Sequence, residues 1–129
     1  MDIEYIPGDL VMVKESALRF AKDKTFKVIS SLISGFVKVV MLNDSSTTYS
    51  ISNNAVRPIP LTPEILEKNG WEHKYDIYFK EFPHRILAIM DENAYIINEC
   101  CSMFLCPAKF VPQLQHLLFG LGLNSEMEL

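Results

Sequence analysis

Thiols are the first groups in this chain that could do chemistry. Cys100, Cys101 and Cys106 fall within seven residues, and thiolates can act as nucleophiles or bind zinc. Adjacent cysteines in an extended strand point to opposite faces, and an odd, crowded set does not form a disulfide framework. A zinc site would need a fourth ligand, and with His116 as the nearest histidine the spacing matches no zinc pattern. We therefore expect buried thiols that act as small hydrophobic side chains, with no metal and no cofactor.

The remaining residues contain no catalytic motif. The sequence has no Gly-x-Ser-x-Gly turn, no paired metal-binding histidines and no glycine-rich phosphate loop. His73 lies on the apolar face of an expected strand and His84 directly follows Pro83, and we expect both to be hydrogen-bonded structural histidines. We predict that the protein is not an enzyme.

The longest connection between expected strands, residues 14–24, is the first candidate for binding. Its basic and aromatic residues are Lys14, Arg19, Phe20, Lys22 and Lys24. Such a loop could hold a peptide or a nucleic-acid backbone. A solvated charged loop is the alternative, because surface loops usually mix charges and Glu15 and Asp23 interrupt the basic residues.

The second candidate for binding is the expected helix that Pro112 opens and that runs through residues 113–120. Four leucines lie at positions i, i+3, i+4 and i+7 and predict one apolar stripe against a sheet: Leu114, Leu117, Leu118 and Leu121. Phe119 falls on the opposite side, beside His116 and Gln115, where solvent is expected. Phe119 therefore needs a second cover, which the chain itself, a dimer mate or another partner could supply. His116 and Phe119 are the candidate binding residues of this helix.

A shorter helix after Thr62 divides the chain into two β-rich halves. Thr62 can cap its first turn, Pro63 suits the first helical position, and Leu61 can pack on Leu66. Gly70 can adopt the left-handed conformation that ends the helix, after which Trp71 would fold back on Leu66. These signals organise a fold and carry no chemistry.

Length and charge limit the classes of function. The chain has 129 residues and 49% hydrophobic content, enough for one core, whereas two independent halves of about 60 residues would each be marginal. Residues 1–60 contain seven basic and six acidic side chains, and residues 61–129 contain five and ten. Neither half has the charge of a strong nucleic-acid binder. The amino-terminal residues show no signal pattern and no apolar run approaches the roughly 18 residues of a membrane span, so a cytoplasmic location without a membrane partner is expected.

Strand patterns fill both halves. In the first, residues 10–13, 26–29, 36–42 and 47–52 are apolar, β-branched or alternating, and five short strands are expected in under 60 residues. In the second half, apolar and polar residues alternate over 72–80, which predicts one strand with a buried face and a solvent-exposed face. Residues 86–97 predict a hairpin with its turn at 91–93. Residues 101–105 can add another strand, which Pro107 should end.

These patterns predict an α+β protein with two subdomains packed as one unit. Residues 1–58 are expected to form a small β-barrel, and residues 59–129 an antiparallel sheet covered by two helices. The phrase Pro7-Gly8-Asp9 before an apolar strand, followed by a long first loop, resembles the start of the SH3-like barrels.

Two further phrases resemble a family of short uncharacterised bacterial and phage-encoded proteins. They are Pro58-Ile59-Pro60-Leu61-Thr62 with the Gly70-Trp71 end, and the later run from Val111 to Phe119. Proteins of that family carry a Pro-Ile-Pro-Leu-Thr helix start and a closing helix built around Val-His-Gln-Leu-Gln. The resemblance implies no activity, cofactor or catalytic residue, and Pro112 stands where the family usually has histidine.

The sequence as a whole predicts an interaction module without enzymatic activity. A protein partner is the favoured interpretation, with an association with phage or mobile elements suggested by the resemblance. The alternative is a nucleic-acid-associated accessory protein that uses the basic loop 14–24, although the acidic total weakens it because binding to DNA or RNA requires several phosphate contacts.

Overall fold

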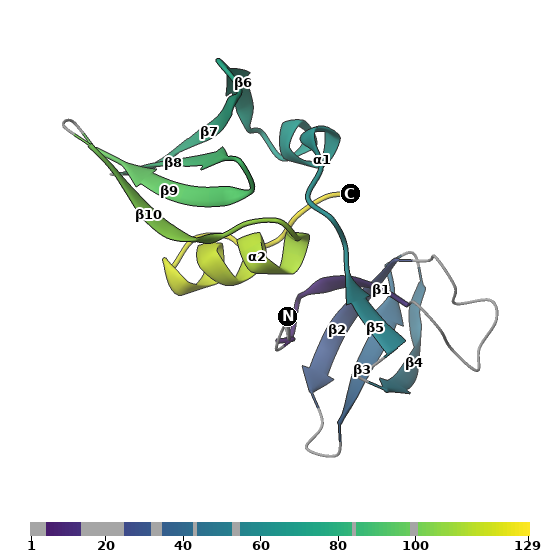
Figure 1. The fold of residues 1–129 in the computed structure, drawn as a ribbon. Helices are drawn as coiled ribbons and strands as arrows, with labels where there is room; N and C mark the ends of the chain where they lie inside the picture. The colour runs from purple at the N-terminus through teal and green to yellow at the C-terminus, as the bar shows by residue number, and fades with distance from the viewer. Residues whose placement is uncertain are drawn as a thin grey trace. The chain divides into compact units, whose positions relative to one another are not determined.

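The structure is a computed structural model that describes residues 5–13, 25–31, 35–42, 44–52, 55–83, 85–98 and 101–129. The chain divides into two compact units, Met1–Ile59 and Pro60–Leu129, each of which contains one five-stranded sheet (Figure 1). Together with two helices, these sheets confirm a mixed α+β fold. The expectation that the two units pack as one body stays a prediction.

The first unit is an antiparallel sheet of short strands. Its strands are β1 (Leu10–Val13), β2 (Thr25–Ser31), β3 (Phe36–Met41), β4 (Asp44–Ser52) and β5 (Val56–Pro58). Side chains alternate across the sheet, so that Phe26 and Val28 are buried whereas Lys27 between them is exposed. The buried face joins β1, β2, β3, β4 and β5 in one apolar core, which explains why these positions are β-branched or aromatic.

The first sheet is open in the part of the chain that the structure describes. Its strand order is β4-β3-β2-β1-β5, so β4 and β5 are the two edges and do not pair with each other. The expected closed barrel is therefore not observed, and the SH3-like fold stays a prediction. Strand β4 also begins earlier than the strand expected over residues 47–52, because Asp44 already pairs with Met41.

The Pro7-Gly8-Asp9 phrase forms a tight turn that leads into β1. The N–H of Asp9 donates to the Ile6 carbonyl (3.1 Å), and Gly8 has a φ of +99° that favours glycine. The Ile6 N–H donates to Oδ2 of Asp9 (2.9 Å), so the carboxylate is buried with a hydrogen bond to backbone. Burial, and then the nearby Asp9 carboxylate, raises the pKa of Tyr5 to about 12. This motif is structural here.

The second unit is an antiparallel meander with two helices. Its strands lie in the order β10-β9-β8-β7-β6. They are β6 (Glu72–Lys74), β7 (Ile77–Phe82), β8 (Arg85–Met90), β9 (Asn93–Ile97) and β10 (Ser102–Pro107). The predicted hairpin is confirmed as β8 and β9, joined by a turn at Asp91 and Glu92.

The single strand expected over residues 72–80 is wrong, because the chain reverses there. Strands β6 and β7 pair as a hairpin with Lys74 opposite Ile77. The two turn residues, Tyr75 and Asp76, have φ values of +54° and +65°, the backbone of a two-residue type I′ turn. Such turns usually contain Asn or Gly. Because neither residue is present here, the alternation of apolar and polar residues continues through the turn and conceals it. Tyr75 is consequently 85% exposed instead of lying on a buried face.

We expect Asp76→Gly to stabilise the second unit by about 1 kcal/mol, because a non-glycine residue at positive φ is strained by roughly that amount. Chemical denaturation would measure the change. Glu72→Gly in the paired strand is the matched control and should destabilise by up to about 1 kcal/mol. Equal effects of the two substitutions would contradict the turn assignment.

Helix α1 (Pro63–Lys68) has the ends that the sequence predicts. The N–H of Ile65 donates to Oγ1 of Thr62 (3.3 Å). At the other end, Trp71 N–H donates to the Leu66 carbonyl (3.0 Å) and Gly70 N–H to the Glu67 carbonyl (3.1 Å), with Gly70 at φ +88°. This pair of bonds is a Schellman motif, and it places Trp71 in the core beside Leu66, with its ring edge-on to Phe82.

Helix α2 (Val111–Gly120) follows β10 (Figure 1). It contributes more buried residues to the core of the second unit than α1 does. Leu114 and Leu118 are buried in one cluster with Leu87 of β8 and Ala94 of β9, which confirms the stripe against the sheet. The carbonyl of Lys109, just before α2, accepts from Leu61 N–H (2.9 Å), so the starts of the two helices are tied together. Within the described residues, no helix has the length and apolar character needed to cross a membrane.

Candidate functional site

The candidate loop for binding lies outside the described residues. Lys14, Arg19, Phe20, Lys22 and Lys24 all fall in residues 14–24. The structure therefore neither supports nor contradicts a binding role for this loop.

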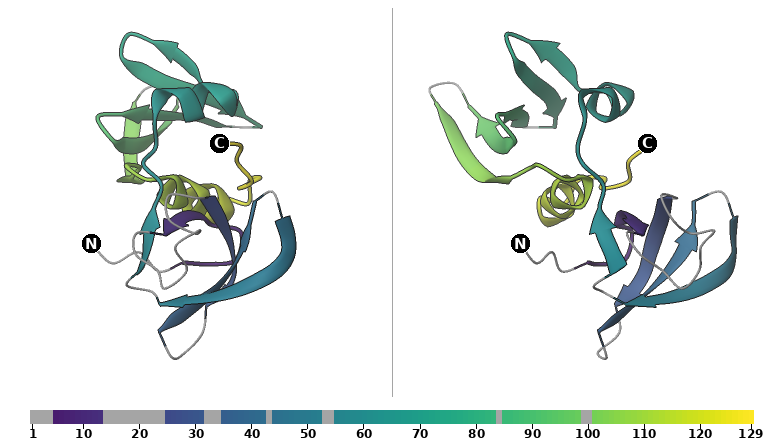
Figure 2. Two further views of the ribbon diagram at one scale, coloured as in Figure 1. Left: turned by 90° about the vertical axis from the view of Figure 1, so that its right-hand side faces the viewer. Right: turned by 45° about the vertical axis from the view of Figure 1, so that its right-hand side comes forward.

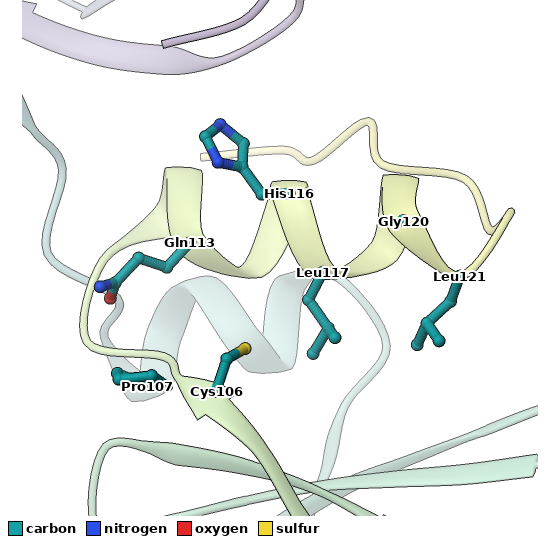
Figure 3. A pocket seen from close by; sticks show the side chains of 7 residues that line it. All are labelled: Cys106, Pro107, Gln113, His116, Leu117, Gly120 and Leu121. Carbon is teal, nitrogen blue, oxygen red and sulfur yellow. The ribbon is translucent and has the colours of Figure 1, made fainter. Parts of the chain in front are cut away.

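A groove of about 500 Å³ lies between β10 and α2 in the second unit (Figure 3). We call it the β10–α2 groove, and the residues that line it are Cys106, Pro107, Gln113, His116, Leu117, Gly120 and Leu121. The sulfur of Cys106 and the side chains of Leu117 and Leu121 point into the space between strand and helix. None of the lining residues is Asp, Glu, Lys or Arg, so the groove offers apolar surface without a charged group.

Five of the lining residues form one face of α2. Residues 113, 116, 117, 120 and 121 lie at positions i, i+3, i+4, i+7 and i+8. This face adjoins the buried stripe and shares Leu117 and Leu121 with it. Both leucines are half-buried, and they contact the core while lining the groove. The core thus fixes the position of the helix face that the groove exposes.

The start of α2 is fixed by Gln113. Its Oε1 accepts from the backbone N–H of Lys109 (2.8 Å) and of Phe110 (3.1 Å). These bonds satisfy N–H groups that precede the helix, as in one arm of a capping box. The bonds also hold the turn from β10 into α2, and therefore the width of the groove at that end.

Of the two predicted residues on this helix, one lines the groove and one does not. His116 is half-buried and contributes to the wall, although its imidazole points to the other side of α2 (Figure 3). Phe119 is 66% exposed and is not among the lining residues. A dimer mate as its cover stays a prediction. Gln115, expected on the solvent side beside Phe119, is instead buried.

The expectation of buried thiols is wrong for one described cysteine and partly right for the other. Cys101 is exposed and Cys106 is half-buried in the groove, and both are free thiols. Burial raises the pKa of the Cys106 thiol, so it is less ionised at neutral pH than an ordinary cysteine, which disfavours a nucleophile. Cys100 and His84 lie outside the described residues.

We expect iodoacetamide to alkylate Cys101 faster than Cys106 at pH 8, because only the thiolate reacts and Cys106 is both less ionised and less exposed. The pH profile of Cys106 alkylation should lie at higher pH than that of free cysteine, because burial raises the pKa of the Cys106 thiol. Mass spectrometry of a Cys100→Ser chain resolves the two sites. Faster alkylation of Cys106 would mean that the groove activates its thiol.

The other histidine in the described chain has a surface role. His73 is exposed and stacks on Tyr78 across the β6–β7 pair, with ring centroids 4.4 Å apart and an angle of 11°, so the expected buried position is wrong. Among the described residues, no three His, Cys, Asp or Glu side chains gather closely enough to hold a metal ion.

Sequence reasoning missed most of the groove, because it interpreted Leu117 and Leu121 as core alone. The missed lining residues are Cys106, Pro107, Gln113, Leu117, Gly120 and Leu121. Because α2 contains no Asp, Glu, Lys or Arg on any face, a helical projection would not have distinguished the face that contains Gly120. The contribution of β10 depends on how the strand and the following helix pack, which no pattern within either element encodes.

The chain matches no protein-family model, and neither the curated proteins nor the solved structures show significant similarity to it.

Proposed function

We propose that this protein is a non-enzymatic interaction module that binds an apolar peptide segment of another protein in the β10–α2 groove. The observation that carries the proposal is the uncharged lining of a groove of about 500 Å³. This volume falls within the range of about 300–1,000 Å³ typical of ligand sites. An open, apolar groove on a helix face suits apolar side chains presented by a peptide.

The strand beside the groove adds apolar surface. Strand β10 is an edge of its sheet, and Met103 and Phe104 on it are 57% and 49% exposed. Neighbouring residues of a strand point to opposite faces of the sheet, so at most one of these two side chains can extend the apolar surface of the groove. The register shift between Phe104 and Cys106, and Pro107 at the end of the strand, hinder the addition of a further strand. Recognition through side chains in the groove is therefore favoured over strand addition.

The chemistry of the lining residues favours binding over catalysis. The raised pKa of Cys106 keeps its thiol protonated, and the imidazole of His116 points away from it. A cysteine nucleophile is usually activated by a neighbouring base or by a lowered pKa, and the Cys106 thiol has a raised pKa. The absence of charge from the lining also disfavours a phosphate-bearing ligand in this groove.

Selection from a displayed library of random 12-residue peptides tests the proposal. We expect the wild-type chain to enrich peptides with two or more large apolar side chains. Counter-selection on Gly120→Arg, which places a charged side chain over the groove, should remove them. Enriched peptides that bind Gly120→Arg as well as the wild type would contradict the proposed site.

We also propose that the first unit is an SH3-like barrel. We propose as well that the chain is related to the short bacterial and phage-encoded proteins that its sequence resembles. Support for the barrel comes from the strand order, in which β5 returns to pair with β1. Nucleic-acid binding by residues 14–24 predicts a different result: retention of DNA at low salt that Lys22→Ala and Lys24→Ala weaken equally for all sequences.

A further inference from the structure

The segment that follows α2 turns back toward α1. Gly122 has a φ of +74° and its N–H donates to the Phe119 carbonyl (3.0 Å), while Leu123 N–H donates to the Leu118 carbonyl (2.9 Å). These bonds end α2 in a second Schellman motif. Residues 122–129 then run from the end of α2 toward α1 (Figures 1 and 2). The positive φ of Gly122 is the left-handed conformation that this cap requires.

Side chains of the two helices hold the backbone of this segment. Asn69, at the end of α1, bonds both backbone groups of Glu128: its Nδ2 donates to the carbonyl (2.7 Å), and its Oδ1 accepts from the N–H (2.8 Å). Nε2 of Gln115 in α2 donates to the Ser125 carbonyl (3.2 Å). Lys68 Nζ donates to the Leu129 carbonyl. Each of these bonds recognises the main chain of the segment and none requires a particular side chain in it.

The side chains of the segment alternate between two environments. From Leu121 to Leu129 every second residue is half-buried and those between are exposed, as in an extended chain. Leu123 and Met127 pack against the core of the second unit, whereas Glu126 and Glu128 are exposed. Backbone hydrogen bonds with apolar side chains at alternate positions are the usual means by which proteins bind extended peptides.

We propose that the end of α1 and the adjoining side of α2 form a second binding site, specific for an extended peptide, which residues 124–129 occupy as a strap that follows the cap of α2. This site is separate from the β10–α2 groove and does not depend on the proposed function. The strap closes the site in the folded chain, and its release opens the site to a segment of the same chemistry. The occupant is the chain's own segment, because its backbone is the one that Asn69 and Gln115 bond.

Amide hydrogen exchange on the full chain tests the strap. The Glu128 N–H should be protected in the wild type, and Asn69→Ala should accelerate its exchange at least tenfold. The amide of Leu123, which belongs to the cap of α2, should keep its protection. Asn93→Ala is the matched control, since Asn93 donates to the Asp91 carbonyl (3.1 Å) in a turn of the same unit, and it should leave Glu128 unchanged. The proposal would be contradicted if the Glu128 amide of the wild type exchanged at the rate of an unstructured peptide. It would also be contradicted if Asn69→Ala accelerated exchange equally throughout the second unit.

A peptide with the sequence of residues 122–129 tests the site beneath the strap. Met127→Asp in the full chain removes an apolar anchor of the strap while keeping Asn69 and Gln115. This variant should bind the peptide saturably in an NMR titration. The wild type should bind it at least about tenfold more weakly, because its own segment competes at an effective concentration in the millimolar range. Failure of Met127→Asp to bind, with its exchange profile showing an open strap and an intact core, would overturn the site.

Discussion

Replacing Leu114 by Ala should destabilise the second unit by about 2–5 kcal/mol, the usual cost of truncating a fully buried leucine. Leu114 has no exposed surface and lies in the cluster that joins α2 to the sheet. Chemical denaturation measures the change as a shift of the midpoint.

Leu117→Ala is the matched control for Leu114→Ala. Both leucines belong to the stripe that the sequence predicts, but Leu117 is half-buried and lines the groove. Its truncation should cost less than about 2 kcal/mol, because fewer contacts are lost. Equal costs for the two substitutions would show that the groove is filled and that Leu117 is core.

Gly120→Arg should weaken the binding of a selected apolar peptide by about 10- to 100-fold. An apolar side chain shut out of the groove loses about 1.5–3 kcal/mol of burial, and each 1.4 kcal/mol is tenfold in affinity. A Cβ on Gly120 would meet no atom within 4 Å, so the fold should accept the arginine. A cation in the last turn is also favourable for the helix dipole. Isothermal titration calorimetry measures the affinity.

Gly120→Ala separates obstruction of the groove from an effect on the helix. Alanine in a helix is more stable than glycine by about 0.5–1 kcal/mol, so this variant should be as stable as the wild type or more so. It should bind the peptide with unchanged affinity, since a methyl group leaves the groove open. Loss of binding in Gly120→Ala would indicate that the helix end, and not the groove, determines affinity.

Local signals in the sequence predicted the parts of the fold that depend on few residues. The capped helix α1 is the clearest case, because Thr62 and Gly70 each satisfy backbone groups within four residues of themselves. The hairpin of β8 and β9 was also predictable. The hairpin of β6 and β7 was not, since apolar and polar residues alternate through its turn at Tyr75 and Asp76, whereas three consecutive polar residues at 91–93 interrupt the apolar runs of β8 and β9.

The site depended on how neighbouring elements pack against each other and not on a pattern within one element. The stripe that contains Leu117 was visible in the helical period, but the groove exists only because β10 places Cys106 opposite it. Gln115 lies on the side of α2 that the period assigns to solvent. It is buried, and it donates a hydrogen bond to Ser125 of a segment that returns to the helix. No pattern within α2 encodes that return.

Protection of Cys106 from alkylation is the most direct test of a peptide-binding groove. Cys106 lines the groove, whereas Cys101, exposed before β10, is not among its lining residues and serves as an internal control. In a Cys100→Ser chain, saturation with a selected peptide should slow iodoacetamide alkylation of Cys106 at least about tenfold and leave Cys101 unchanged. Unchanged alkylation of Cys106 at a peptide concentration that saturates the chain would contradict the account, because the peptide would then bind elsewhere.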